Sequence, residues 1–224
     1  MGIEQRFVDT YEAIPLDFGQ PQSLSAGQAD LTLKRVIDVA LAVIALVALS
    51  PLLLVIALLI RLDSPGPAFF RQTRLGLGGR PFQILKFRTM TVMENGDRIV
   101  QAKKDDPRVT RLGRFLRKTS LDELPQLINV LKGEMSIVGP RPHAQAHDQY
   151  YSYMIEDYCG RQRVKPGITG WAQVNGFRGE TPTLQSMCDR VAHDLWYVRN
   201  FSIALDIQIL ARTVREVLRP RNAH

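Results

Sequence analysis

The chain has 224 residues and a formal net charge of +7 at pH 7, which is enough length for one sizeable domain with its own core. Two cysteines, Cys159 and Cys188, exclude a disulfide-rich scaffold and lack the spacing of metal ligands. A pI of about 9.7 indicates an anionic partner, which is nucleic acid, an anionic membrane surface or a polyphosphate substrate.

The N-terminal residues 1–30 carry several Pro, Gly and Ser residues and no helical or strand period. This composition predicts a loosely ordered extension. The segment also lacks the pattern of a cleavable signal peptide.

Residues 39–60 form the strongest apolar segment, with no charge and Ser50 as its one polar residue. About 20 apolar residues suffice for a helix to cross a bilayer core. Pro51 in the middle predicts a break, because it lacks an N–H and clashes with the preceding turn. Basic residues flank both ends (Lys34, Arg35 and Arg61), and positive residues favour the cytoplasmic side. We therefore predict a re-entrant helix-break-helix over residues 31–62, broken at Ser50 and Pro51; a kinked spanning helix is the alternative.

A β-hairpin is predicted next, from residues 68–72 and 81–87 on either side of a glycine-rich turn at 76–79. The glycines are not a phosphate loop, because no Walker Lys-Ser/Thr follows them. The second strand leads into Lys86 and Arg88. Taken alone, this pair is a solvated strand edge.

Residues 109–118 mix apolar and basic positions, and Leu112, Phe115 and Leu116 share one helical face. Such a helix either lies on an anionic lipid surface or packs on the core with its charges in water.

Two adjacent acids, Asp122 and Glu123, lie between a basic run and Arg141. Nearby positive charge keeps carboxylates ionised and suits a phosphate-bearing substrate. Ser120 and Glu123 have the spacing of a capping box; alternatively, Pro125 takes the first helical position. Either arrangement places the acids near a helix N-terminus, whose dipole stabilises negative charge. Gly133 is predicted to end that helix.

The C-terminal part begins with residues 164–176, which are rich in Gly, Pro, Trp and amide side chains. They form either a hydrogen-bonding loop for a base or sugar or a well-packed irregular loop. Two amphipathic helices follow, with core or interface stripes. The stripes are Leu184, Met187, Val191 and Leu195, then Ile203, Ile207, Leu210, Val214 and either Val217 or Leu218. The predicted fold class is α+β, mainly helical, with a catalytic domain over residues 63–224.

Several motifs occur in order: LKRVIDV, the Ser-Pro break, LKFRTM, SLDELPQL, GEMSIVGPRP and KPGITGWAQVNG. Together they resemble the bacterial sugar transferases, the monotopic polyprenol-phosphate phosphoglycosyl transferases, from about Leu33 to the C-terminus. The chain is similar to the short, catalytic-core members. The resemblance implies transfer of a sugar 1-phosphate from a UDP-sugar to undecaprenyl phosphate with release of UMP, the first membrane step of exopolysaccharide synthesis. The C-terminal run is most similar to glucose-1-phosphate transferring members, so UDP-glucose is expected first and UDP-galactose next.

The resemblance also implies site roles. Asp122 would be the nucleophile of a two-step ping-pong exchange through an aspartyl-phosphosugar intermediate, and Glu123 the second acid. Mg²⁺ would be held by one of these two acids. The expected phosphate contacts are Lys86, Arg88 and Arg141, and the expected nucleotide or sugar contacts are Gln173, Asn175 and Arg178.

These roles imply a place on the cytoplasmic face of the bacterial inner membrane, where the protein's amphipathic helices would contact anionic lipids. The composition also admits two other classes of protein. One is a membrane-tethered nucleic-acid-binding protein, which lacks a recognition helix, zinc module or RNA-binding aromatic motif. The other is a catalytically silent scaffold. We expect no nucleic acid partner, and the sequence leaves a homo-oligomer open.

Overall fold

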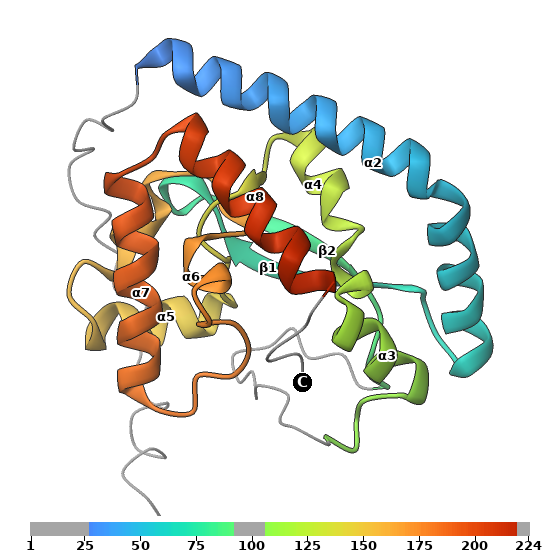
Figure 1. The fold of residues 1–224 in the computed structure, drawn as a ribbon. Helices are drawn as coiled ribbons and strands as arrows, with labels where there is room; N and C mark the ends of the chain where they lie inside the picture. Colours follow the sequence, from blue (N-terminus) through green and yellow to red (C-terminus); the bar gives the residue numbers. More distant parts are fainter. Residues whose placement is uncertain (1–26, 92–105, 219–224) are drawn as a thin grey trace, which may run out of the picture.

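The computed structural model describes residues 27–91 and 106–218, which fold into a mainly helical body with two small sheets (Figure 1). The predicted α+β class is confirmed. The predicted N-terminal extension lies almost wholly outside the described residues. The elements are α2 (Gln28–Asp63), β1 (Phe69–Leu75), η2 (Leu77–Gly79), β2 (Pro81–Phe87), α3 (Arg111–Thr119), η3 (Leu121–Glu123), α4 (Gln126–Lys132), β3 (Ser136–Val138), α5 (Gln145–Met154), η4 (Tyr158–Arg163), β4 (Gly167–Thr169), α6 (Trp171–Val174), α7 (Leu184–Arg199) and α8 (Ile203–Leu218).

The apolar segment forms one continuous helix, α2, with Pro51 inside it. The predicted interruption is not a gap between two helices, although the ribbon of α2 changes direction in its second half (Figure 1). Ser50 Oγ donates to the carbonyl of Val47, at 2.9 Å. That carbonyl is the one that Pro51, lacking an N–H, cannot bond, so the serine replaces part of the lost helical bonding.

Most of α2 is exposed, although it is long and apolar enough to cross a membrane. Only Asp38, Ala42, Ile56 and Ile60 are buried in it. Large apolar side chains such as Val47 and Leu54 are 70% and 73% exposed. A helix that belongs to a soluble core buries its apolar face, so α2 is a membrane-type helix in composition and exposure.

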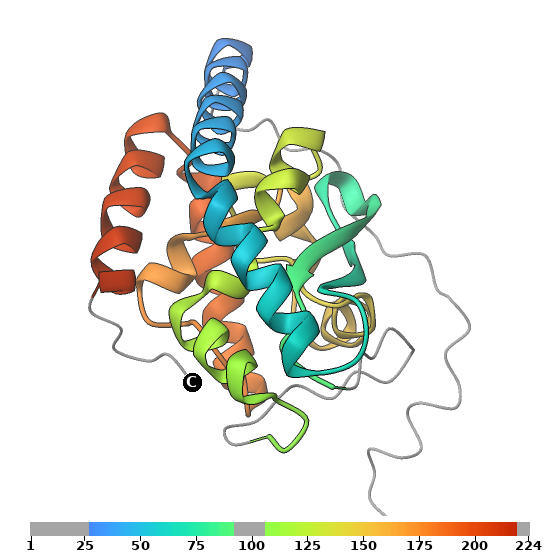
Figure 2. The same cartoon turned by 90° about the vertical axis from the view of Figure 1, so that its right-hand side faces the viewer.

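Both ends of α2 are tied to the same body. Near its start, Arg35 donates to the carbonyls of Val130 and Leu131 of α4, at 2.6 and 2.9 Å. At its end, Arg88 donates to the carbonyls of Ser64 and Pro65, at 2.5 and 2.6 Å. The helix therefore runs along the body between these two attachments, and its first turns extend beyond the other elements (Figures 1 and 2).

The predicted hairpin is confirmed: β1 and β2 pair antiparallel from Phe69↔Phe87 to Leu75↔Pro81. Its inner face packs on α4 and α2 in one apolar cluster. Asn129 of α4 locks this contact, because its side chain donates to the carbonyl of Gln83 and accepts from the amide of Leu85. These bonds fix β2, and hence Lys86, relative to the chain that leads out of the acid pair.

A second sheet pairs β3 with β4 in parallel, with Val138 opposite Thr169. The two backbones approach closely at glycines. A Cβ added at Gly139 would lie 2.4 Å from the carbonyl oxygen of Lys165, and one at Gly167 would lie 2.1 Å from the amide nitrogen of Gly139. The Gly-rich motifs therefore bring the segment before Arg141 against the segment after Lys165.

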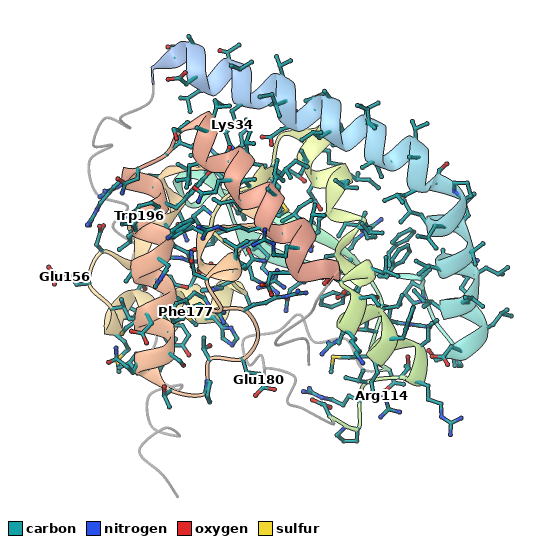
Figure 3. The ribbon with its side chains drawn as sticks, viewed as in Figure 1. Lys34, Arg114, Glu156, Phe177, Glu180 and Trp196 are labelled. Atoms are coloured by element: carbon teal, nitrogen blue, oxygen red, sulfur yellow. The ribbon has the colours of Figure 1, made fainter. Side chains whose placement is uncertain are left out.

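The two C-terminal helices differ in how well the stripes were predicted. On α7, Met187 and Val191 are buried as expected. On α8 the prediction was right in part. Ile203 and Leu210 pack on the core with the buried Leu205 and Ile209, but Ile207 and Val214 are 60% and 59% exposed. The buried Asp206 determines which face of α8 is directed inward, because its Oδ2 lies 2.5 Å from Lys34 Nζ of α2. Figure 3 shows Lys34 between α2 and α8, and Figure 2 shows α8 at the edge of the molecule.

Candidate active site

The acid pair, Asp122 and Glu123, lies in the short turn η3 between α3 and α4, which we call the acid turn. Ser120 is the C-cap of α3 with a left-handed backbone (φ 60°), and its side chain caps no following helix. The predicted capping box is therefore wrong. The alternative is close to what is seen, because Pro125 immediately precedes α4 in a helical conformation. Gly133 ends α4 as predicted. The turn at Ser120 reverses the chain, and both acids are buried.

Glu123 is held by two cations from different parts of the chain. Lys86 Nζ of β2 lies 2.8 Å from its Oε1. Arg141 Nη1 lies 3.0 Å from its Oε2, and Arg141 Nη2 also donates to Oε1. Although burial opposes it, the charges of Arg141 and then Lys86 hold the pKa of Glu123 well below its usual range. Glu123 is therefore a permanent carboxylate with both oxygens engaged.

Asp122 has a different environment. Its side chain is 8% exposed, and within the described residues its carboxylate accepts no hydrogen bond. Burial, together with the charge of Glu123, raises the pKa of Asp122 to about 6, against the opposing charges of Lys86 and Arg117. At neutral pH it is ionised, with lone pairs available to an electrophile or a metal ion.

Arg117 is a part of the site that the motifs did not single out. Its cation is the second strongest opposite charge on Asp122 after Lys86, and its side chain is fixed by bonds to Thr89 Oγ1 at 2.9 Å and Met90 Sδ at 3.0 Å. The signal that could have found it is its place in the basic run, one helical turn before the acids.

Arg88 does not join the acid pair. Its guanidinium donates to the carbonyls of Ile60, Ser64 and Pro65 at the end of α2. Both terminal nitrogens are used in these bonds and Arg88 is only 4% exposed, whereas the Arg141 side chain is 27% exposed. The structure therefore favours anchoring of the membrane helix over the predicted phosphate contact for Arg88.

The predicted nucleotide or sugar contacts also separate. Arg178 Nη2 donates to Ser120 Oγ, which brings it to the acid turn. Gln173 donates to the carbonyl of Ile168 at 3.1 Å, and Asn175 donates to the carbonyl of Trp171 at 2.8 Å. These two amides therefore stabilise their own loop, and Asn175 also accepts from Arg212 of α8 at 3.3 Å. The side-chain oxygen of Gln173 is buried without a partner among the residues that the structure describes.

The chain is similar to known proteins of one family. The family profile described as bacterial sugar transferase matches residues 29–220. A UDP-glucose:undecaprenyl-phosphate glucose-1-phosphate transferase of Escherichia coli is 58% identical over 182 residues, which are 81% of this chain and 39% of that protein. A Caulobacter vibrioides protein of the same name is 55% identical over 85% of this chain and 72% of its own length.

Other relatives widen the range of sugars. A third glucose-1-phosphate transferase, from Xanthomonas campestris, is 56% identical, and this chain spans 40% of its length. A UDP-N-acetylgalactosamine-undecaprenyl-phosphate N-acetylgalactosaminephosphotransferase of Aeromonas hydrophila is 43% identical. The match over nearly all described residues shows that the chain belongs to the bacterial sugar transferase family.

Proposed function

We propose that this protein transfers glucose 1-phosphate from UDP-glucose to undecaprenyl phosphate and releases UMP. The relatives named for this reaction are 55–58% identical to the chain, while the one named for N-acetylgalactosamine is 43% identical. The observation that carries the proposal is the contrast between the two acids: Glu123 is fixed by Lys86 and Arg141, and Asp122 beside it is ionised and unengaged.

The reaction proceeds in two displacements, which makes it ping-pong. An oxygen of Asp122 forms a bond to the phosphorus that carries the sugar, and the bond from that phosphorus to the bridging oxygen breaks, so UMP leaves. A phosphate oxygen of undecaprenyl phosphate then attacks the same phosphorus and restores Asp122. A covalent intermediate divides one encounter between two anions into two easier steps.

Lys86 and Arg141 supply the charge that these steps need. Both converge on Glu123 from β2 and from the loop after β3, and the planar fork of arginine binds phosphate oxygens in pairs. Glu123 keeps the two cations in place before the substrate arrives. Such preorganised charge stabilises a transition state without reorganisation at the moment of reaction.

Mg²⁺ is the cofactor that the family implies. No group of three or more His, Cys, Asp or Glu side chains in the described ranges could hold a metal by itself. The residues still fit magnesium, which takes one or two carboxylates together with substrate phosphates. Among the described residues Asp122 accepts no hydrogen bond, whereas both oxygens of Glu123 already accept from Lys86 and Arg141, so Asp122 is the better placed of the two to bind it. When bound, Mg²⁺ would offset the negative charge of the diphosphate.

A re-entrant placement of α2 completes the proposal. A helix of 36 residues is about 54 Å long, yet Arg35 and Arg88 fasten both of its ends to one body. A straight crossing would separate those ends across the bilayer. We therefore place α2 in one leaflet at the cytoplasmic face of the bacterial inner membrane. The exposed Phe115 of α3 and Ile207 of α8 extend the surface that meets lipid.

The direct test supplies the purified full chain with UDP-glucose, undecaprenyl phosphate and Mg²⁺, and measures UMP and lipid-linked sugar. Parallel reactions receive UDP-galactose or UDP-N-acetylgalactosamine. The proposal expects the highest kcat/KM with UDP-glucose. Faster transfer from another UDP-sugar would show that this other UDP-sugar, and not UDP-glucose, is the substrate. Failure to release UMP from any of the three UDP-sugars would favour the catalytically silent scaffold.

Topology needs its own experiment, with single cysteines placed near residues 27 and 66 in a Cys159→Ser, Cys188→Ser background. Both should react with an impermeant thiol reagent from the cytoplasmic side only. Labelling of the two positions from opposite sides would contradict the re-entrant placement.

The nucleic-acid class has less support than the net charge suggests, because several cations bind the chain's own groups. The cations that bind groups of the protein itself include Lys34, Arg35, Arg88 and Arg141. Binding to DNA with a steep salt dependence would support that class.

A further inference from the structure

Arg141 needs support because it lies in a segment with no helix or strand of its own, between β3 and α5. The three carbonyls of residues 140–142 nevertheless each accept a hydrogen bond from a different part of the chain. Pro140 accepts from the amide of Gly167 at 2.9 Å. Arg141 accepts from Arg161 Nη2 at 2.7 Å, and Pro142 from Arg74 Nη1 at 3.2 Å.

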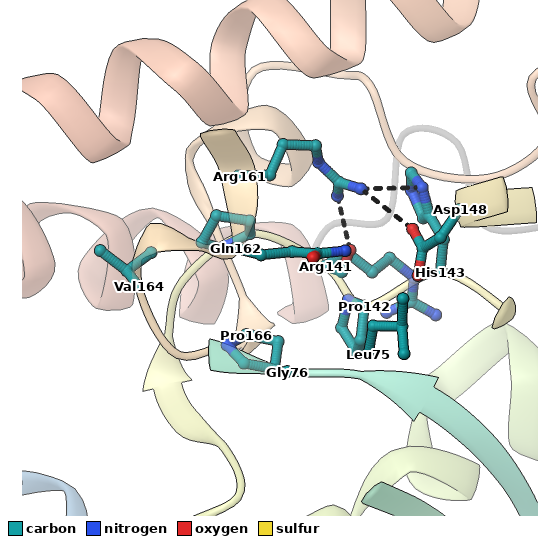
Figure 4. Close-up of a pocket in the computed structure, with 11 residues that line it drawn as sticks. Leu75, Gly76, Arg141, Pro142, His143, Asp148, Arg161, Gln162, Val164 and Pro166 are labelled. Carbon is teal, nitrogen blue, oxygen red and sulfur yellow. Dashed lines mark hydrogen bonds and ion pairs between the residues drawn. The ribbon is translucent and has the colours of Figure 1, made fainter. Parts of the chain in front are cut away.

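Of these donors, Arg161 has the most complete set of contacts. Its Nε and Nη2 lie 2.9 and 2.8 Å from Asp194 Oδ2 of α7. Its Nη1 lies 2.9 Å from His143 Nδ1 and donates to Tyr158 Oη at 3.2 Å. Figure 4 shows this guanidinium reaching Arg141, His143 and Asp148 around one small cavity.

Arg161 is 4% exposed and Asp194 is 1% exposed. A buried ion pair adds little to stability compared with apolar residues of the same volume, so stability alone does not account for it. Its geometry does suggest a purpose, because one fork joins the rigid helix α7 to the carbonyl of Arg141.

We infer that Arg161, held by Asp194, is a positioning residue that fixes the backbone of Arg141 and thereby the fork that Arg141 presents at Glu123. This inference rests on the proposed function for its kinetic consequences. Arg161 acts through Arg141 and does not itself contact substrate.

The first test replaces Arg161 by Lys, which keeps the charge and cannot bind Asp194, His143 and the Arg141 carbonyl together. We expect kcat/KM for UDP-glucose to fall about 10- to 100-fold, the usual effect of losing a group that orients a site residue. Arg163→Lys is the matched control, since Arg163 lies in the same turn and pairs with Asp157; its transfer rate should not change.

A double-mutant cycle separates positioning from general damage. If Arg161 acts through Arg141, then Arg161→Lys should cost almost nothing further in an Arg141→Ala background. If the two residues acted independently, their fold-losses in kcat/KM would multiply. An Arg161→Lys loss that is as large in the Arg141→Ala background as in the wild type would therefore overturn the inference.

Two further measurements keep the inference testable whatever the first variants do. If Arg161→Lys does not fold, the double variant Arg161→Met, Asp194→Leu removes both buried charges together; near-normal transfer in that folded protein would refute the positioning role.

Hydrogen exchange needs no turnover. Peptides covering residues 139–144 should exchange faster in Arg161→Lys than in the wild type, and at the wild-type rate in Arg163→Lys. If wild type releases no UMP, the proposed function fails, while equal exchange in both variants refutes the positioning itself.

Discussion

Two buried charge clusters in this protein differ in one respect. At the contact of α2 with α8, Asp206 uses both oxygens, with Lys34 at 2.5 Å and the Tyr197 hydroxyl at 2.7 Å. At the acid turn, Glu123 is bound as fully, but its neighbour Asp122 accepts no hydrogen bond from the described residues. A closed cluster holds elements together, whereas an open one keeps a charged oxygen ready to react. The open cluster is therefore where we place the chemistry.

The largest effect should come from Asp122→Asn, which removes the reactive oxygen. Transfer should fall by about 10⁴-fold or more, as for loss of a nucleophile, in UMP-release assays. Its stability should rise, because burial lifts the pKa of Asp122 from 3.8 to about 6. The folded protein then binds that proton more tightly than the unfolded chain, so stability falls as pH rises from about 4 to about 6.

The asparagine variant avoids that cost and should gain up to about 3 kcal/mol at pH 7 in denaturant unfolding. Near-normal transfer by this variant would remove Asp122 from the nucleophile role. Loss of transfer together with loss of stability would point to a structural role instead.

A smaller effect should follow from pH, through the same open carboxylate. Because the ionised form of Asp122 reacts, kcat/KM should rise with pH, about tenfold per unit below pH 6, and level off above it. Lys86→Met should move that midpoint upward, since Lys86 lowers the pKa of Asp122. A flat profile from pH 5 to 8 in initial-rate measurements would contradict the assignment.

A substitution in the closed cluster should change the stability of the fold and leave catalysis unchanged. Lys34→Met leaves the buried Asp206 without its cation and should destabilise the fold by about 3 kcal/mol, as seen in thermal unfolding. Transfer per folded molecule should not change. A specific loss of kcat in the folded variant would show that this cluster also serves catalysis.

The smallest effect on transfer is expected at Arg88. Arg88→Lys loses part of the bonding to Ser64 and Pro65 and should cost about 1–3 kcal/mol of stability, while KM for UDP-glucose stays at the wild-type value. A raised KM with unchanged stability would restore the phosphate contact that the LKFRTM motif suggested.

The sequence predicted the features that depend on local pattern. The hairpin around the glycines, the end of α4 at Gly133 and the exposed apolar helix are all present, because turn chemistry and hydrophobic length act over short distances. The bond from Ser50 to the carbonyl left by Pro51 also follows from local backbone chemistry.

Long-range contacts could not be predicted in the same way. Arg88 and Lys86 are two residues apart and would share one face of a continued strand, yet one anchors α2 and the other binds Glu123. The strand β2 ends at Phe87, so Arg88 lies beyond it and strand alternation does not set its direction. The buried face of α8 depends on Asp206 meeting Lys34, residues far apart in the chain. Arg161 and Asp194 likewise meet only through the packing of η4 on α7.

The central claim is that Asp122 carries the phosphosugar, and intact-mass spectrometry tests it most directly. The protein is incubated with UDP-glucose and Mg²⁺ without undecaprenyl phosphate, quenched in acid, and digested for peptide mapping. The account predicts a mass increase of one glucose phosphate on the peptide containing Asp122, which disappears when undecaprenyl phosphate is added. An adduct on another residue, or UMP release only when both substrates are present, would contradict it.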